Sequence, residues 1–264
     1  MEFSCKEIAP GVRQIGDGQD NFCTLLTGSR SAVLFDTMVG LGDLKGFLRE
    51  LCPMEPTVIA SHGHFDHIGG ARQFSTVYLN PADLPLLEVG RSQIPVLEQT
   101  LGRDLSGMEE SFQPQRYQPI RPGQALDLGG MTVEAVDLSG HTAGSIGLLC
   151  RDLGLLLAGD ALSPQACILF PESLPLEHYA QLLERAGQLP FDRFLSAHFD
   201  FPFPKHMIEN FSRCIPLVGR KRGMEYAFGP LPYIKGRLYV GEVHNQEIGQ
   251  LICLITKPDT PPLS

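Results

Sequence analysis

Three of the chain's eight histidines lie within six residues, in the segment His62-Gly63-His64-Phe65-Asp66-His67. This segment directly follows an apolar, β-branched run at 57–61 that predicts a buried strand. Because residues two apart on an extended segment share a face, His62 and His64 can reach one metal ion. Asp66 and His67 lie beyond the turn and can point to a second ion. Imidazole and carboxylate are ligands that zinc, manganese and iron(II) accept, so the spacing predicts metal chemistry.

Three further residues of ligand type each follow an apolar run that predicts a strand. His141 comes after 136–140, Asp160 after 155–159 and His198 after 194–197. Strand ends bring side chains from distant parts of a chain to one place. A histidine-rich surface turn, the alternative interpretation of the first cluster, predicts no such repetition. The pattern therefore favours one shared site that four strands build.

The elements that must position these residues alternate along the chain. Helices are expected at 42–51, near Gly69, and at 176–189 and 205–218. Strands are expected at 24–27, 32–35, 57–61, 131–138, 145–150, 153–158 and 191–197. One or two more strands are expected in 237–255. This order predicts two sheets with helices outside, in a single domain over 1–264.

Two segments stand apart from this alternation. Residues 80–122 contain six prolines and weak helical pieces at 82–89 and 94–101, and we interpret them as an insertion or lid. Residues 205–264 are expected to form a C-terminal extension that packs on the same domain. Loops around a fixed site carry selectivity, so 80–122 and the segment 163–174 are expected to determine specificity.

Composition limits the classes of function. Acidic residues outnumber basic ones, 30 to 21, which disfavours nucleic acid as a partner and leaves a small-molecule substrate. The sequence has no apolar stretch long enough to span a bilayer and no visible secretory signal, so we expect no membrane association and a cytoplasmic location. The seven scattered cysteines include no Cys-x-x-Cys pair, so they predict neither a disulfide framework nor a thiolate metal site. The oligomeric state stays open.

The ordered motifs resemble those of the metallo-β-lactamase fold hydrolases. They are His-x-His-x-Asp-His at 62–67, Gly-His-Thr-x-Gly-Ser at 140–145, Gly-Asp at 159–160 and a late histidine at 198, and Asp36 matches the family's early aspartate. The resemblance implies an α+β fold, specifically a four-layer αββα sandwich with the metal site at one edge of the two sheets.

The resemblance also implies the role of each residue by its position. One metal ion is held by His62, His64 and His141, and a second ion is held by Asp66, His67 and His198. Asp160 bridges both ions, and Asp36 accepts an imidazole N–H that fixes a ligand's tautomer. Asp66 and Asp160 are the expected catalytic residues, because Asp66 abuts the bridging hydroxide and could pass a proton to the leaving group.

Charge balance independently supports two ions. Two divalent ions bring four positive charges, and the carboxylates of Asp36, Asp66 and Asp160 with one bridging hydroxide bring four negative charges. Without metal, these acids would repel one another beside neutral imidazoles. A metal-bound water has a pKa of about 7, so hydroxide is available at neutral pH to attack an ester-like carbonyl.

Within the superfamily the sequence is similar to the glyoxalase II-like group of thioester, ester and lactone hydrolases. Asp160 stands where the antibiotic-degrading members usually lack an aspartate, and His64 stands where the flavoprotein branch normally carries glutamate. Two alternatives stay open. The first is a persulfide dioxygenase, because these enzymes share the motifs and hold one iron through residues equivalent to His62, His141 and Asp160. The second is a non-catalytic metal-binding or regulatory protein. The expected cofactors are two divalent ions, zinc first, with manganese or iron as alternatives.

Overall fold

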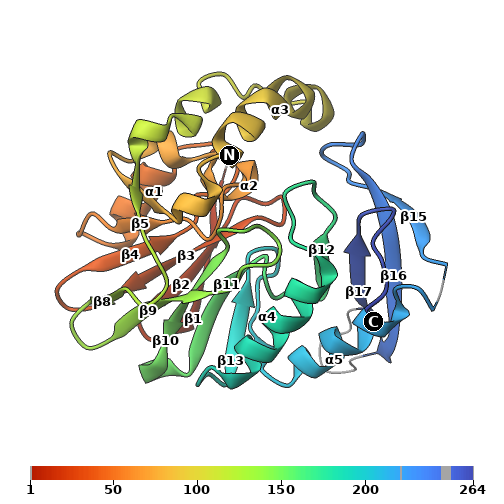
Figure 1. Cartoon of the computed structure of the whole chain (residues 1–264). Coiled ribbons are helices and arrows are strands. Elements are labelled where there is room, and N and C mark those ends of the chain that lie inside the picture. Colours follow the sequence, from red (N-terminus) through yellow and green to blue (C-terminus); the bar gives the residue numbers. More distant parts are fainter. Residues whose placement is uncertain (1, 221, 245–250, 264) are drawn as a thin grey trace.

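The computed structural model describes residues 2–220, 222–244 and 251–263 (Figure 1). Its first sheet contains seven strands in chain order, which are β1 (Ser4–Ala9), β2 (Val12–Gly16), β3 (Phe22–Thr27), β4 (Ala32–Phe35), β5 (Thr57–Ile59), β6 (Val77–Leu79) and β7 (Tyr117–Pro119). Neighbouring strands are antiparallel from β1 to β4 and parallel from β4 to β7. The parallel part is therefore the part that leads into the histidine cluster after β5.

The second sheet has six strands in the order β14-β13-β11-β10-β9-β8. Their bounds are β8 (Ala125–Asp127), β9 (Thr132–Asp137), β10 (Ile146–Cys150), β11 (Leu155–Gly159), β13 (Arg193–Ser196) and β14 (Phe203–Pro204). Strands β11 and β13 are parallel, so their carboxyl ends meet at the same edge of the sheet. Asp160 and His198 follow these two ends.

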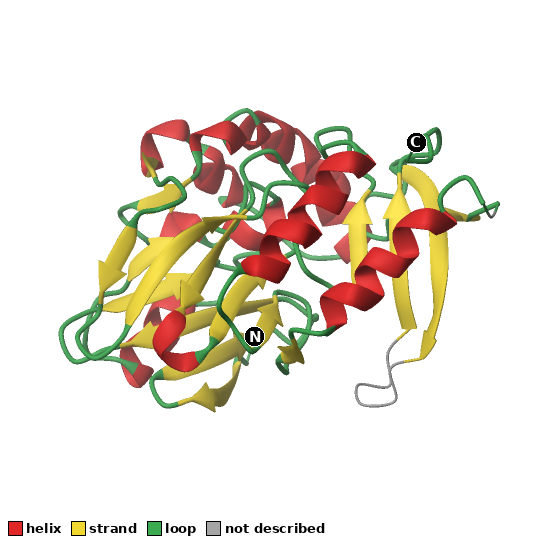
Figure 2. Ribbon diagram, turned by 60° about the horizontal axis from the view of Figure 1, so that its bottom comes forward, coloured by secondary structure: helices red, strands yellow, loops and turns green. Residues whose placement is uncertain are grey.

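The two sheets pack face to face over an apolar core. Alternation along each strand sends Val33 and Phe35 of β4 into this core, while Leu34 faces the opposite side. The outer faces are covered by the helices α1 (Leu44–Leu51), α2 (Phe65–Ile68), α3 (Leu86–Leu101), α4 (Leu176–Gln188) and α5 (Met207–Cys214), as Figure 2 shows. The predicted α+β sandwich of two sheets between helical layers is confirmed.

Main-chain hydrogen bonds join the two sheets at the edge that carries the site. The amide of Ile146 at the start of β10 donates to the carbonyl of Ser61, which follows β5, over 2.9 Å. The amide of Phe22 on β3 donates to the carbonyl of Ala197, which follows β13, also over 2.9 Å. These bonds fix the loops that carry the first histidines and His198 relative to each other.

A third sheet stands at one side of the sandwich, drawn in blue and blue-green in Figure 1. Its order is β12-β17-β16-β15, with the bounds β12 (Gln165–Ile168), β15 (Met224–Ala227), β16 (Lys235–His244) and β17 (Leu251–Thr256). The predicted extension 205–264 thus contributes three strands, and β12 joins them from the middle of the chain. The predicted strands in 237–255 correspond to β16 and β17, and residues 245–250 between them lie outside the described residues.

Two helices differ from the sequence-based expectation. Residues 86–101 form one helix that continues through Pro95, where two pieces were expected, and the left-handed Gly102 ends it. The helix expected near Gly69 begins earlier, at Phe65, and Gly69 caps its end. Leu97 of α3 and Phe112 lie buried in the hydrophobic cluster on the outer face of the first sheet.

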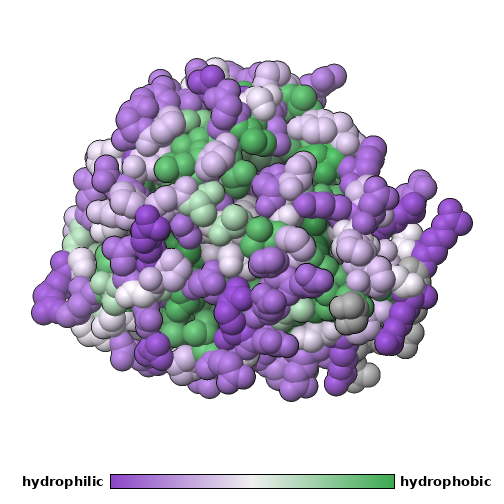
Figure 3. All heavy atoms as spheres, viewed as in Figure 1, coloured by the Kyte–Doolittle hydropathy of each residue, from purple (hydrophilic) through white to green (hydrophobic). Residues whose placement is uncertain are grey.

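Short 3-10 helices complete the described elements. They are η1 (Ala71–Gln73), η2 (Pro81–Asp83), η3 (Met108–Phe112), η4 (Pro114–Arg116), η5 (Arg151–Leu153) and η6 (Ile215–Leu217). Among the described residues, no helix is both long and apolar enough to cross a membrane. The face of the molecule in Figure 3 is mostly hydrophilic, with hydrophobic side chains in small separated groups.

Candidate metal centre

Three histidines from two loops converge at the edge of the sandwich. Nε2 of His62 lies 3.0 Å from Nδ1 of His64, and Nε2 of His141 lies 3.0 Å from the same atom. His62 and His64 follow β5, and His141 follows β9, so the structure brings together residues that are almost eighty positions apart. The three nitrogens form one of the groups whose ligand atoms could hold an ion.

In each of these rings, one nitrogen points away from the centre, and its hydrogen bond shows which nitrogen carries the proton. His64 Nε2 donates to Glu172 Oε1 over 2.7 Å, and His141 Nδ1 donates to the carbonyl oxygen of Cys167 over 2.5 Å. His62 Nδ1 donates to Ser61 Oγ over 3.0 Å, because the hydroxyl proton of Ser61 is directed to a carboxylate. The inward nitrogens therefore carry no proton, and their lone pairs face one another. Zn–N bonds of 2.0–2.1 Å in a tetrahedral site place nitrogens about 3.3 Å apart, so this donor set fits a divalent ion.

A second group contains Asp66, His67 and His198. His67 Nδ1 donates to Asp36 Oδ2 over 2.9 Å, and His198 Nδ1 donates to the carbonyl of Asp20 over 2.9 Å. Both Nε2 atoms therefore face inward, 3.9 Å and 3.7 Å from the oxygens of Asp66. These three side chains also form a group with metal-ligand geometry.

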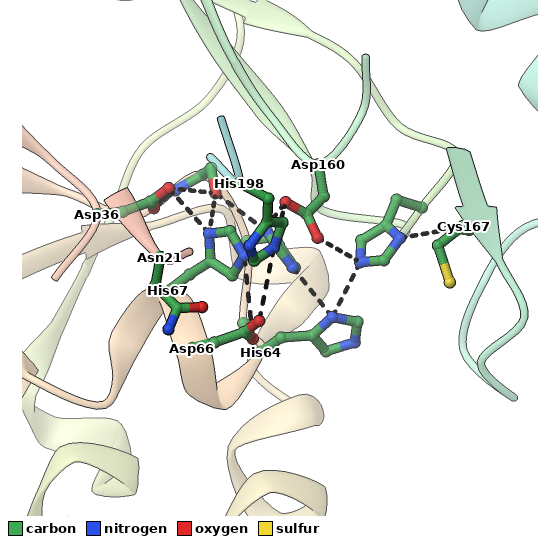
Figure 4. Close-up of polar contacts among 12 residues, drawn as sticks. Asn21, Asp36, His64, Asp66, His67, Asp160, Cys167 and His198 are labelled. Carbon is green, nitrogen blue, oxygen red and sulfur yellow. Dashed lines mark hydrogen bonds and ion pairs between the residues drawn. The ribbon is translucent and has the colours of Figure 1, made fainter. Parts of the chain in front are cut away.

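Asp160 lies between the two groups, as Figure 4 shows. Its Oδ1 is 3.4 Å from His67 Nε2 and 3.2 Å from His198 Nε2, while its Oδ2 is 3.6 Å from His141 Nε2. His67 Nε2 and Asp160 Oδ1 are buried and have no hydrogen-bond partner in the described structure. Buried polar atoms are normally paired, so these two atoms are placed as metal ligands would be.

In the absence of metal, two histidines of the first group and both histidines of the second group have pKa values that are shifted in opposite directions. Burial lowers the pKa of His62 well below its usual value and that of His141 to about 4, so both rings are neutral. Burial also lowers the pKa of His198, but the charges of Asp160 and Asp66 outweigh it and raise the pKa to about 9. Burial lowers the pKa of His67 as well, and nearby carboxylates outweigh this effect and raise the pKa well above its usual value. Both rings are therefore protonated beside the carboxylates of Asp66 and Asp160 at neutral pH.

Asp36 fixes the orientation of His67 and of the loop before it. Its Oδ1 accepts the Ser61 amide over 2.7 Å, and its Oδ2 accepts the Ser61 hydroxyl and His67 Nδ1, each over 2.9 Å. Asp36 has a positive φ of 69°, a backbone conformation that costs a non-glycine residue free energy and that is concentrated at functional sites. The Asp36 carboxylate thus lies where it can accept the imidazole N–H of His67.

Asp83 joins the two histidine loops and was missed by the sequence analysis. Its carboxylate accepts the amides of Gly63 over 2.9 Å and Gly144 over 2.7 Å, and the hydroxyl of Thr142 over 2.7 Å. Burial raises the pKa of Asp83, and these three hydrogen bonds oppose the rise. A Cβ at position 144 would lie 2.5 Å from the Asp83 carboxylate, which explains the glycine there.

A cavity of about 870 Å³ opens over both groups. Its floor includes five of the ligand-type side chains, namely His64, Asp66, His141, Asp160 and His198. Glu172, the partner of His64, also lines it, and so does Gln93 from α3. This size is typical of sites that enclose a small molecule, and the cavity gives such a molecule direct access to the ligand groups.

Comparisons with known proteins show the family to which the chain belongs. The family profile described as "Metallo-beta-lactamase superfamily" matches residues 16–198. Acyl-coenzyme A thioesterase MBLAC2 of Bos taurus is 26% identical over 200 residues, covering 67% of this chain and 72% of that protein. Hydroxyacylglutathione hydrolase of Albidiferax ferrireducens is 24% identical over 185 residues, covering 68% and 62%.

The solved structures show the same fold. TTHA1623 in a di-iron-bound form superposes with a TM-score of 0.53 at 22% sequence identity, covering 71% of this chain and 91% of that one. The matched family segment contains all six residues of the two ligand groups, and it contains Asp160 as well. The chain therefore belongs to the metallo-beta-lactamase superfamily, and it is a metal-dependent hydrolase of that superfamily.

Proposed function

We propose that the protein is a binuclear metal-dependent hydrolase of small thioesters or related esters. The observation that carries this proposal is the position of Asp160, whose two oxygens face the second and the first ligand group at 3.4 Å from His67 Nε2 and 3.6 Å from His141 Nε2. A carboxylate placed in this way suits a bridge between two ions. The acyl-coenzyme A thioesterase among the relatives supports a thioester as substrate.

The proposed ligands of the first ion are His62, His64 and His141, and those of the second are Asp66, His67 and His198. When bound, two divalent ions supply a nucleophilic hydroxide near neutral pH and stabilise developing negative charge. Zinc is the first expectation. Manganese and iron are alternatives, and the di-iron form of TTHA1623 supports the latter.

The protein's own groups prepare this chemistry. The five outward hydrogen bonds of the histidines hold every inward nitrogen in place before a ligand arrives, which removes an ordering cost from binding. Asp66 is half-buried, lines the cavity and lies 3.7 Å from His198 Nε2. We assign to its carboxylate the transfer of a proton to the leaving atom.

The persulfide dioxygenase alternative uses one iron on His62, His141 and Asp160. It leaves the second group, Asp66, His67 and His198, without a role, although His67 Nε2 is buried without a hydrogen-bond partner in the described structure. The binuclear proposal accounts for both groups, and for this reason we favour it.

Metal analysis of protein purified without chelators or added metal tests the proposal. About two equivalents of zinc, manganese or iron, with hydrolysis of thioesters or lactones in a screen that also contains phosphodiesters, would support it, whereas hydrolysis of phosphodiesters alone would contradict the proposed substrate class. About one equivalent of iron, with oxygen uptake on addition of a persulfide, would replace it with the dioxygenase. Bound metal with no turnover in either assay would favour a regulatory protein.

A further inference from the structure

The cavity over the ligand groups has two unlike walls. On the side of the third sheet, the wall contains a group of apolar side chains, namely Phe170, Tyr226, Phe228, Pro230, Leu231 and Ile255, beside the polar Ser163, Gln165 and Glu172. The opposite wall is mixed: polar side chains such as Lys6, Gln14 and Asn21 alternate with Phe22, Phe199 and Phe201. A molecule bound at the centre therefore meets different chemistry at its two ends.

The apolar wall begins at the first ligand group. The ring of Phe170 lies 4.7 Å from the ring of His64 and 5.5 Å from that of His141, measured between centroids. Phe228 continues the wall, with its ring 5.1 Å from Phe170. Leu231 and Ile255 are buried in the same hydrophobic cluster, so the wall has a firm support.

The mixed wall adjoins the second ligand group. Figure 4 shows Asn21 beside His67 and Asp66, on the side away from Cys167. Asp20, the neighbour of Asn21, accepts the Nδ1 hydrogen bond of His198 through its carbonyl. The proposed proton carrier, Asp66, therefore lies on the mixed side.

Tyr226, Phe228, Leu231 and Ile255 lie beyond residues 16–198, the segment that the family profile matches. They come from β15, from the loop after it and from β17. The ligand groups thus belong to the common part of the superfamily, whereas most of the apolar wall comes from the third sheet and from the loop between its strands β15 and β16.

We propose that the apolar wall binds the hydrocarbon chain of the substrate's acyl group, and that the third sheet is the element that selects acyl-chain length. This inference rests on the proposed thioesterase function. A carbonyl at the centre directs its acyl chain and its leaving group to opposite sides. Because the leaving thiol needs the proton and Asp66 lies on the mixed side, the acyl chain lies against Phe170 and Phe228.

The reaction is a simple hydrolysis. Water adds at the acyl carbon, a C–O bond forms and the C–S bond breaks, and the sulfur takes a proton. The products are a carboxylic acid, which ionises, and a thiol. The apolar wall takes no part in bond making, so it acts on the choice of substrate.

The test uses the metal-loaded full chain and thioesters of N-acetylcysteamine with acyl groups of increasing length, from acetyl to octanoyl. We expect kcat/KM to rise by up to about fourfold per added CH2 group until the wall is covered. S-octyl thioacetate carries the long chain on the thiol instead. We expect octanoyl-N-acetylcysteamine to be the better substrate, and the reverse preference would overturn the orientation.

Phe228→Ala and Phe201→Ala form a matched pair, because both side chains are partly buried phenylalanines that line opposite walls. Phe228→Ala should lower kcat/KM for the octanoyl thioester at least tenfold and change that for the acetyl thioester less than threefold. Phe201→Ala should leave the ratio of the two unchanged. A loss of the length preference in Phe201→Ala alone would place the chain on the other wall and refute the proposal.

Binding of the product separates this inference from the proposed function. Octanoate should bind the metal-loaded protein at least tenfold more tightly than butyrate by calorimetry, and Phe228→Ala should abolish the difference. If no thioester is hydrolysed but this length dependence holds, the proposed function fails and the apolar site stands. Equal affinities for octanoate and butyrate in the wild type would overturn the inference even in an active thioesterase.

Discussion

Glu172 Oε1 accepts a hydrogen bond from His64 Nε2 over 2.7 Å, and as a result His64 presents Nδ1 to the centre. The other four histidines, namely His62, His67, His141 and His198, present Nε2. Glu172 therefore selects the tautomer and the ring orientation that allow His64 to meet its two partner nitrogens at 3.0 Å.

Removing this acceptor should weaken the first metal site. Glu172→Ala should lower the affinity for one of two ions by about 10–100-fold, the usual effect of losing such a partner. Glu172→Gln retains an oxygen acceptor and should cost much less. Titration with a competing chromophoric chelator measures both. Equal affinities in the alanine variant and the wild type would show that His64 needs no partner.

Asp160 should be essential for turnover. Asp160→Ala removes the carboxylate that faces both groups and leaves the buried His67 Nε2 without its nearest oxygen at 3.4 Å. We expect activity to fall by more than three orders of magnitude while the circular dichroism spectrum stays that of the wild type. Turnover within tenfold of the wild type would remove the assignment of Asp160 as the bridge.

The two ligand groups should lose metal separately. His62→Ala deletes a nitrogen of the first group, and His198→Ala deletes one of the second, so each variant should retain about one equivalent of metal in elemental analysis. The same substitution at His178, which lies outside both groups, should leave the metal content unchanged. Two equivalents in both ligand variants would contradict the proposed ligand set.

The metal-free protein should be most stable near pH 6.5, because the buried His141 has a lowered pKa and His198 has a raised pKa. The pKa of His198 is raised from 6.5 to about 9, so its contribution to stability is fully present below about pH 6.5 and is lost as the pH rises through 9. The pKa of His141 is lowered to about 4, so the unfolded chain takes up a proton as the pH falls from 6.5 towards 4, which destabilises the fold.

Melting temperatures of the metal-free protein from pH 4 to pH 10 measure this dependence. His198→Asn should flatten the decline between pH 7 and pH 9, because it removes the group that titrates there. An unchanged alkaline decline in that variant would assign it to other groups, with His67 as the first to examine.

Asp83 should control both stability and metal binding. Asp83→Ala leaves the buried amides of Gly63 and Gly144 without an acceptor, at a cost of about 1–3 kcal/mol for each donor. Thr142→Val removes one hydrogen bond to the same carboxylate and should cost less. Urea unfolding of the metal-free variants measures the cost. If the two variants are equally stable, Asp83 does not hold the two loops together.

The ligand-type residues could be predicted because their signal is local. His62, His64, Asp66 and His67 share one short segment, and each remaining residue of ligand type directly follows an apolar run. Such runs also predicted the two main sheets, because a strand that is buried on both faces reads as continuous hydrophobic sequence.

The partners of these ligands could not be predicted in the same way. Glu172 lies 108 positions from His64, and Asp20 lies 178 positions from His198. The acceptors for His141 and His198 are main-chain carbonyls, which any residue provides, so no residue type marks them. The single helix through Pro95 was missed for a different reason: a proline in the sequence normally ends a helix, and here burial of Leu97 accompanies its continuation.

The pairing of β12 with β17 has a consequence for the time at which the protein acquires its metal. Cys167, whose carbonyl orients His141, lies on β12, and β12 pairs in the sheet with β17, where Cys167 lies opposite Ile255. A ribosome must therefore add 88 more residues after Cys167 before β12 can be held in its final place. We expect nascent chains to load the first site only after β17 has emerged from the ribosome.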